Sequence, residues 1–223
     1  MGIERARVVE VHAQTSATRR AGSGYQISDR LVLTHGGVVG GDGRTDVRPA
    51  GTAVWVPASV VWRARAGDVA VLEVDEPSVL MWAPAAVRWG LVAGRRPVSV
   101  TAMGFPPAAD AERPHRARDT HQFVGQLVPD GLPAAATSIP LTASGGGRPT
   151  GDGMSGAALF AGAELVGVLV VDPAPPGRNR LRAVPVSVLA DDPGFVGLVG
   201  DANGLTLIPV VAPSVGFPIL QLP

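Results

Sequence analysis

Ser155 stands in a glycine-rich segment whose residues could perform nucleophilic chemistry. Residues 151–160 read GDGMSGAALF, so the serine lies between glycines and is followed by a short apolar run. Gly153 and Gly156 allow the backbone to turn sharply on either side of Ser155, which aims the hydroxyl outward and lets backbone N–H groups converge on one spot. The pattern predicts a serine nucleophile beside an oxyanion hole, a set of donors that stabilises negative charge on oxygen.

Glycine-rich segments also occur in ordinary turns, in nucleophile elbows and in phosphate-binding loops. An ordinary Gly/Ser turn before a strand has the same composition, so residues 151–160 alone leave that interpretation open. The nucleophile elbow of an α/β-hydrolase requires glycine two residues after the serine, where Ala157 stands. The Gly-rich runs 40–43 and 145–147 lack the Lys and Ser/Thr of a phosphate-binding loop and are predicted to be loops.

The composition indicates which elements must position this serine. The chain has 223 residues, 46% hydrophobic and 17% charged, with 29 Gly and 21 Pro. This length is sufficient for one large β domain or two small ones. The abundance of Gly and Pro favours many short strands joined by tight turns over long helices.

Six short strands are predicted in the first half, which suggests a barrel or a sandwich. A second series of predicted strands begins near residue 87, after an irregular connection at 75–85. The predicted strands of the first half are 5–13, 21–27, 31–34, 52–56, 60–63 and 68–74, those at 52–56 and 60–63 forming a hairpin. The predicted strands of the second half are 87–91, 96–102, 121–127, 135–141, 158–160, 165–171 and 181–184, followed by a helix at 185–190.

The charge and the residue types of the chain argue against several classes of function. The net charge is zero and all basic residues are Arg, so the sequence predicts no nucleic-acid partner. There is no Cys, and the four His show no ligand spacing, so neither a metal site nor a cofactor is expected. No apolar run is long enough to predict a membrane span, and residues 1–12 lack the apolar region of a signal peptide. We therefore expect a cytoplasmic protein.

Three motifs, in this order, resemble the bacterial branch of the chymotrypsin/trypsin-like serine proteases. They are GSGY at 22–25 with LVLT at 31–34, then DVAVL at 68–72, then GMSGA at 153–157. The resemblance covers most of residues 5–195. It implies an all-β fold of two antiparallel six-stranded barrels with a short C-terminal helix. The implied domains are 1–80, an N-terminal barrel, and 81–200, a C-terminal barrel with the serine turn, followed by an apolar Pro-rich tail at 201–223.

The same resemblance assigns roles to individual residues. It makes Ser155 the nucleophile, Gly153 and Ser155 the donors of the oxyanion hole, and Asp68 the residue that orients the base. Without a gap, Gly37 falls on the family's histidine position, and His35 lies two residues early. His35 is the candidate base, because His12, His115 and His121 fit surface or structural positions. If His35 fails to reach Ser155, the chain is a pseudoprotease that binds peptides or proteins.

Specificity and partners follow from the same resemblance. Met154 replaces the Asp of members activated by cleavage, which implies no such zymogen step. Pro149, six residues before the serine, would floor the primary pocket, and it disfavours Arg or Lys side chains relative to small or apolar ones. The implied partner is a peptide or protein substrate, with a signalling protein as a further partner.

Overall fold

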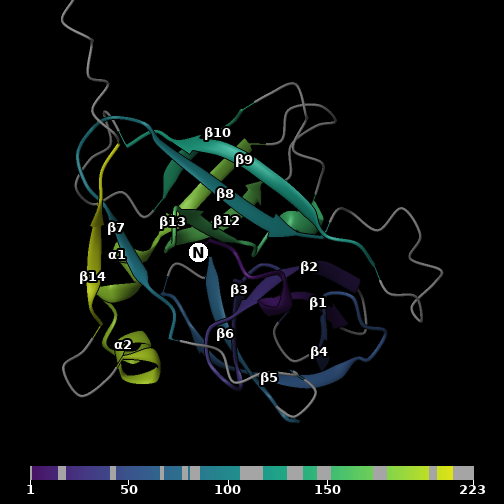
Figure 1. The fold of residues 1–223 in the computed structure, drawn as a ribbon. Helices are drawn as coiled ribbons and strands as arrows, with labels where there is room; N and C mark the ends of the chain where they lie inside the picture. Colours follow the sequence, from purple (N-terminus) through teal and green to yellow (C-terminus); the bar gives the residue numbers. More distant parts are fainter. Residues whose placement is uncertain are drawn as a thin grey trace, which may run out of the picture.

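The computed structural model places two groups of strands one above the other (Figure 1). It describes residues 2–14, 19–40, 44–65, 68–76, 80, 86–105, 118–129, 138–144, 152–172, 180–200 and 205–212. The predictions that concern His115, Pro149 and residues 213–223 lie outside these ranges. Among the described residues, no helix is long and apolar enough to cross a membrane.

The first group is a closed antiparallel barrel with the strand order β1-β2-β3-β6-β5-β4. Its strands are β1 (Val8–Gln14), β2 (Arg19–Gln26), β3 (Leu31–His35), β4 (Arg44–Pro49), β5 (Val56–Arg63) and β6 (Val69–Val74). Alternate residues of β3 face opposite sides: Val32 packs inside the barrel, while Leu31 and Leu33 pack against the second barrel. Because β3 and β6 are buried on both faces, each reads as an almost unbroken apolar run.

The second group closes through the pairing of β11 with β12, which makes a six-stranded antiparallel barrel. Its strands are β8 (Val98–Gly104), β9 (His121–Leu127), β10 (Ile139–Ala143), β11 (Ala158–Ala161), β12 (Glu164–Asp172) and β13 (Arg180–Pro185). Two strands extend it from β12, namely β7 (Trp89–Val92) and β14 (Leu207–Val210), and both run parallel to their neighbours. The predicted all-β double barrel is therefore confirmed, whereas the domain limits stay a prediction.

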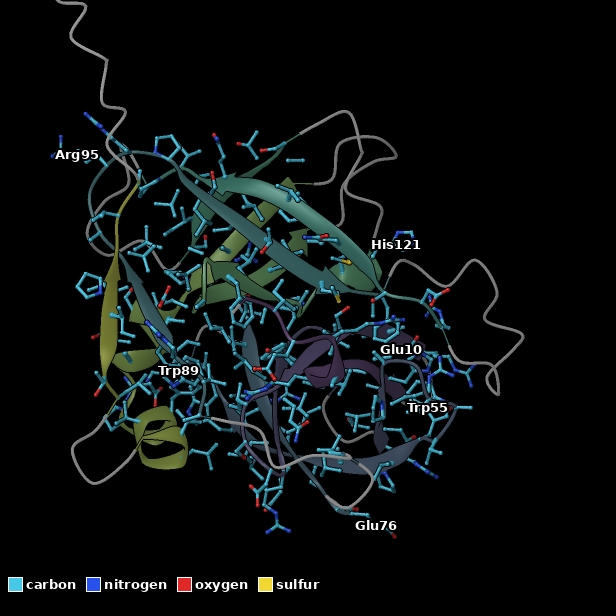
Figure 2. The ribbon with its side chains drawn as sticks, in the orientation of Figure 1. Glu10, Trp55, Glu76, Trp89, Arg95 and His121 are labelled. Atoms are coloured by element: carbon cyan, nitrogen blue, oxygen red, sulfur yellow. The ribbon has the colours of Figure 1, made fainter. Side chains whose placement is uncertain are left out.

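Two short helices follow β13. α1 (Val186–Ala190) is the helix predicted at 185–190, with Pro185 as its N-cap instead of its first residue. α2 (Pro193–Val199) has an N-cap at Asp192, whose carboxylate accepts hydrogen bonds from the N–H groups of Gly194 and Phe195. α2 buries Phe195 against Trp62 of the first barrel and Trp89 of β7. Figure 2 shows Trp89 at this junction. The helix therefore helps to join the two barrels.

The hairpin predicted at 52–56 and 60–63 is wrong. One strand, β5, covers Val56–Arg63, and β4 is the strand of the first barrel that the sequence patterns do not indicate. β4 reads RTDVRP, in which Val47 is the one aliphatic residue, and Arg48 is buried because it pairs with the carboxylate of Glu10. A charged residue at an interior position conceals the alternation on which strand prediction depends.

Candidate active site

The structure brings His35 to Ser155. His35 is the last residue of β3 and Ser155 follows the short 3-10 helix η3 (Asp152–Met154). The Oγ of Ser155 lies 2.9 Å from the Nδ1 of His35, within the range of a hydrogen bond. If Nδ1 is to accept the serine proton, it must be the unprotonated nitrogen, so the neutral ring carries its hydrogen on Nε2. This pair can therefore perform general-base chemistry on the serine.

The turn that follows β3 is held at both its amides and its carbonyls. The N–H of Gly36 donates to the carbonyl of Asp68 at 3.1 Å, and the N–H of Val38 donates to the carbonyl of His35 at 3.0 Å. The guanidinium of Arg63 donates to the carbonyls of Gly36 and Val39 at 3.1 and 2.8 Å. These bonds fix the backbone from which the His35 side chain starts.

The serine turn depends on Gly156, whose φ of +96° lies in the left-handed region. A Cβ at Gly156 would lie 2.1 Å from the carbonyl oxygen of Ser23 and 2.8 Å from the backbone nitrogen of His35. Glycine at this position therefore lets the turn approach β2 and β3 closely. Gly153, predicted to share this conformational freedom, does not have a positive φ.

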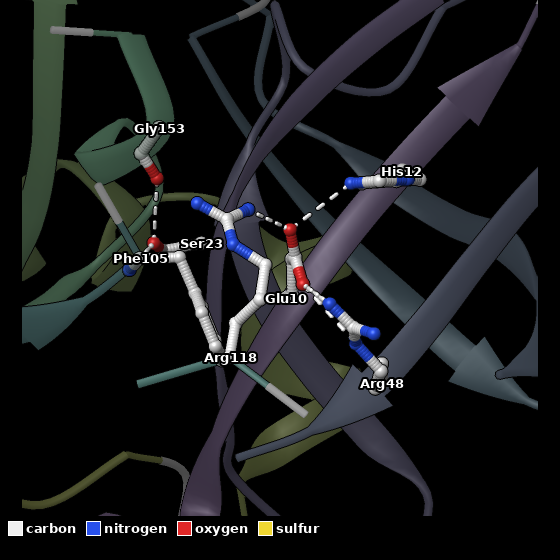
Figure 3. Close-up of polar contacts among 7 residues, drawn as sticks. All are labelled: Glu10, His12, Ser23, Arg48, Phe105, Arg118 and Gly153. Carbon is white, nitrogen blue, oxygen red and sulfur yellow. Dashed lines mark hydrogen bonds and ion pairs between the residues drawn. The ribbon is translucent and has the colours of Figure 1, made fainter. Parts of the chain in front are cut away.

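Ser23 of β2 holds the serine turn against the first barrel. Its hydroxyl donates to the carbonyl of Gly153 at 2.7 Å and accepts from the N–H of Phe105 at 2.8 Å, as Figure 3 shows. Its backbone N–H donates to the carbonyl of Ser155 at 2.8 Å. The carbonyls of Gly153 and Ser155 are therefore both oriented by Ser23, a residue of the other barrel.

The Ser155 side chain lies in a confined position. The residue is 4% exposed, and its Oγ also accepts from the N–H of Val171 at 3.4 Å. Met154 beside it is buried in the interior of the second barrel. The Ser155 hydroxyl is therefore almost closed off from solvent in this structure.

Asp68 comes directly before β6, next to the strand that ends at His35. Among the described residues, the hydrogen-bond partner of its carboxylate is Arg182 of β13, whose Nη1 lies 2.9 Å from Oδ2. Both side chains are about one quarter exposed. The assigned triad residues thus gather at one place, but the Asp68 carboxylate pairs with a cation from the second barrel.

Glu10 forms the most perturbed ionisable site among the described residues. Its buried carboxylate pairs with Arg48 of β4, with Arg118 just before β9, and with the Nε2 of His12 at 3.1 Å (Figure 3). Burial raises the pKa of Glu10, but the hydrogen bonds from His12 and Arg48 and the charges of Arg48 and Arg118 outweigh it and lower this pKa from 4.5 to about 2. Glu10 therefore stays ionised and links the barrels.

Two further histidines, His12 and His121, lie in different surroundings. His12 stacks on Trp55 with ring centroids 4.3 Å apart, and His121 is exposed at the start of β9. No group of three or more His, Cys, Asp or Glu gathers as metal ligands among the residues that the structure describes.

Sequence reasoning missed two residues of this site. Ser23 lies inside the GSGY motif at 22–25, but its partner Gly153 is 130 positions away. No sequence motif indicates a role for Arg182, because its approach to Asp68 depends on how β13 packs beside the other barrel. Both contacts join distant segments, and no local spacing reports them.

Comparisons with known proteins agree with this geometry at the level of the fold. No protein-family model matches the sequence, and no curated protein matches it. The chain is similar to the active form of the Rv3671c protease of M. tuberculosis, with a TM-score of 0.64 and 17% identity over 92% of this chain and 84% of that one.

Two further solved structures give the same result. A serine endoprotease from Yersinia pestis aligns with a TM-score of 0.57 and 20% identity over 82% of this chain and 60% of that one. The thermostable serine protease AL20 from an extremophilic microorganism aligns with a TM-score of 0.59 and 15% identity over 81% and 91%. The chain therefore has the double-barrel fold of the trypsin-like serine proteases.

Proposed function

We propose that this protein is a serine endopeptidase that cleaves peptide bonds through an acyl-enzyme on Ser155. The observation that carries the proposal is the 2.9 Å separation of Ser155 Oγ from His35 Nδ1. A general base must come within about 2.6 to 3.2 Å of the heavy atom whose proton it removes, and His35 meets this condition although it lies two residues earlier in the chain than the family's histidine.

The reaction would proceed in two halves. Ser155 Oγ attacks the peptide carbonyl carbon while its proton passes to His35 Nδ1, and the amides of Gly153 and Ser155 hold the oxyanion. The leaving amine takes that proton when the C–N bond breaks, and a water then hydrolyses the acyl-enzyme by the same path. Asp68 contributes through its backbone, because its carbonyl accepts from Gly36 and fixes the start of the turn.

We propose a small or apolar side chain before the cleaved bond. Pro149 matches the sequence position that floors the primary pocket in the family it resembles, and proline offers no carboxylate to a Lys or Arg side chain. Peptides with Ala, Val or Leu at this position should therefore be cleaved faster than matched peptides with Arg.

The second candidate function is binding of a peptide or protein, such as a signalling protein, without efficient turnover. Two observations favour it: the pairing of the Asp68 carboxylate with Arg182, and the 4% exposure of Ser155. The same cleft and the same oxyanion donors would then hold an extended chain. A weak residual activity would not exclude this function, because trypsin-like enzymes keep about 10³ to 10⁴-fold catalysis over water after losing a triad member.

Labelling with a fluorophosphonate probe tests the proposal, because the probe reports an activated serine without a known substrate. We expect the wild-type protein to label, Ser155→Ala to abolish labelling, and His35→Ala to slow it by about 10² to 10⁴-fold. Ser59→Ala, which removes an exposed serine of β5, is the matched control and should label as the wild type does. Folded wild-type protein that labels no faster than Ser155→Ala would refute the peptidase and leave the binding function.

A further inference from the structure

We infer that Gly37 is a positioning residue for His35: the absence of a side chain at residue 37 provides the space in which the imidazole lies when it reaches Ser155. This inference rests on the proposed function, because it explains how a histidine two residues away from the family position can act as the base. It assigns Gly37 no contact with substrate.

The space at Gly37 is occupied by the imidazole itself. A Cβ built on Gly37 would lie 2.5 Å from Cε1 of His35 and 3.1 and 3.2 Å from Nε2 and Nδ1. All three atoms belong to the edge of the ring that carries both nitrogens. The imidazole of residue 35 thus occupies the place from which a side chain of residue 37 would begin.

The backbone of the turn cannot easily move away to accommodate a side chain. Arg20 donates to the carbonyl of Gly37 at 2.8 Å, and the amides on either side of Gly37 are bonded to Asp68 and His35. Arg63 holds the carbonyls of Gly36 and Val39. Because several hydrogen bonds fix the turn, a methyl group at residue 37 would displace the imidazole, and that displacement breaks the contact with Ser155.

Alanine at this position is otherwise tolerable. Gly37 is exposed, and its φ is not positive, so Gly37→Ala imposes no left-handed strain and meets solvent on its open side. The His35 ring supplies all three of the closest contacts that the new Cβ would make. The effect of Gly37→Ala should therefore depend on whether residue 35 is histidine.

A double-mutant cycle tests this dependence. Fluorophosphonate labelling rates and thermal unfolding midpoints are measured for the wild type, Gly37→Ala, His35→Ala and the double variant. We expect Gly37→Ala to slow labelling by about 10²-fold or more, towards the rate of His35→Ala. In the His35→Ala background the same change should leave both the rate and the midpoint unaltered.

Two further variants sharpen the cycle. Gly197→Ala, at an exposed position in α2 where a Cβ would meet nothing within 4 Å, is the matched control and should label at the wild-type rate. The exchange variant His35→Ala with Gly37→His should label faster than His35→Ala, because the vacated space is then filled by an imidazole attached to residue 37.

The results separate this inference from the proposed function. Gly37→Ala that labels at the wild-type rate, or that costs the same in both backgrounds, would overturn the role of Gly37. If the wild type does not label, the peptidase is refuted, and the unfolding midpoints still decide whether residues 35 and 37 are coupled. Coupled midpoints support the inference in that case, and additive midpoints reject it.

Discussion

The Asp68 carboxylate has a positively charged neighbour, which competes with the role in orienting His35 that the resemblance implies. Where an aspartate orients the histidine of a triad, its replacement by asparagine lowers kcat by about 10⁴-fold, because the imidazole adopts the wrong tautomer. Here the carboxylate pairs with Arg182 at 2.9 Å. The backbone carbonyl of Asp68, which holds Gly36, is unaffected by a change of side chain.

We therefore expect Asp68→Asn to slow fluorophosphonate labelling by less than about 10²-fold, far below the loss in a conventional triad. The cost in stability should be about 1 kcal/mol or less, since the ion pair is partly exposed. Arg182→Gln is the matched control, because it removes the cation and leaves the carboxylate available. A loss near 10⁴-fold in Asp68→Asn would mean that the carboxylate orients His35 directly.

Residue types identified the candidates of this site, but not their contacts. Ser155, Asp68 and His35 could be proposed from ordered motifs, because each motif lies on a local stretch of chain. The reach of His35 could not be predicted, because it depends on a turn that places Gly37 against the ring. That arrangement requires hydrogen bonds from Arg20 and Arg63, which come from other strands.

The turn between η3 and β11 is fixed by one glycine, Gly156. The φ of Gly156 is +96°, and a Cβ there would lie within 3 Å of backbone atoms of Ser23 and His35. Backbone atoms of two paired strands cannot yield as a flexible side chain would. The turn therefore tolerates no side chain at this position.

Gly156→Ala should destabilise the protein by more than about 2 kcal/mol, as left-handed strain and steric overlap add together. Gly51→Ala separates these causes, because Gly51 has a φ of +80° but its Cβ would meet nothing within 4 Å. It should cost only about 1 to 2 kcal/mol. Urea unfolding measures both variants, and equal losses would show that the close approach of the serine turn contributes nothing.

Strand patterns predicted elements well where both faces of a strand are apolar or alternate cleanly. β9, β12 and β13 lie close to their predicted ranges because their apolar residues recur with period two or form a buried run. β14 lies in the tail at 201–223, for which the sequence patterns predict no element. β14 pairs with β7 through residues more than 100 positions apart, so its partner is not visible in local sequence.

Several contacts join the two barrels, and three of them differ in their chemistry. An apolar cluster contains Tyr25 of the first barrel and Phe160 of the second, with ring centroids 5.1 Å apart. Ser23 bonds to Gly153 and Phe105, and Glu10 of β1 pairs with Arg118, which comes just before β9. The apolar contact of Tyr25 with Phe160 is insensitive to pH, whereas the ion pair of Glu10 with Arg118 depends on the charge of one buried carboxylate.

Acid should therefore weaken the junction between the barrels through Glu10. Its pKa is lowered from 4.5 to about 2 in the folded protein, so its contribution to stability is present above pH 4.5 and is lost as the pH falls from about 4.5 towards 2. The shift corresponds to about 3 kcal/mol. Protonation removes the charge that Arg48 and Arg118 share, and Arg118 then no longer holds the two barrels by an ion pair.

Urea unfolding of the wild type and of Glu10→Gln between pH 7 and pH 2 measures this effect. Glu10→Gln should be less stable at pH 7, because Arg48 and Arg118 lose a charged partner, and its stability should fall less steeply below pH 4.5. Glu73→Gln is the matched control, since Glu73 pairs with Arg30 at an exposed site, and it should keep the wild-type slope. Parallel losses in the wild type and Glu10→Gln would mean that other carboxylates govern acid unfolding and that the Glu10 link does not hold the barrels together.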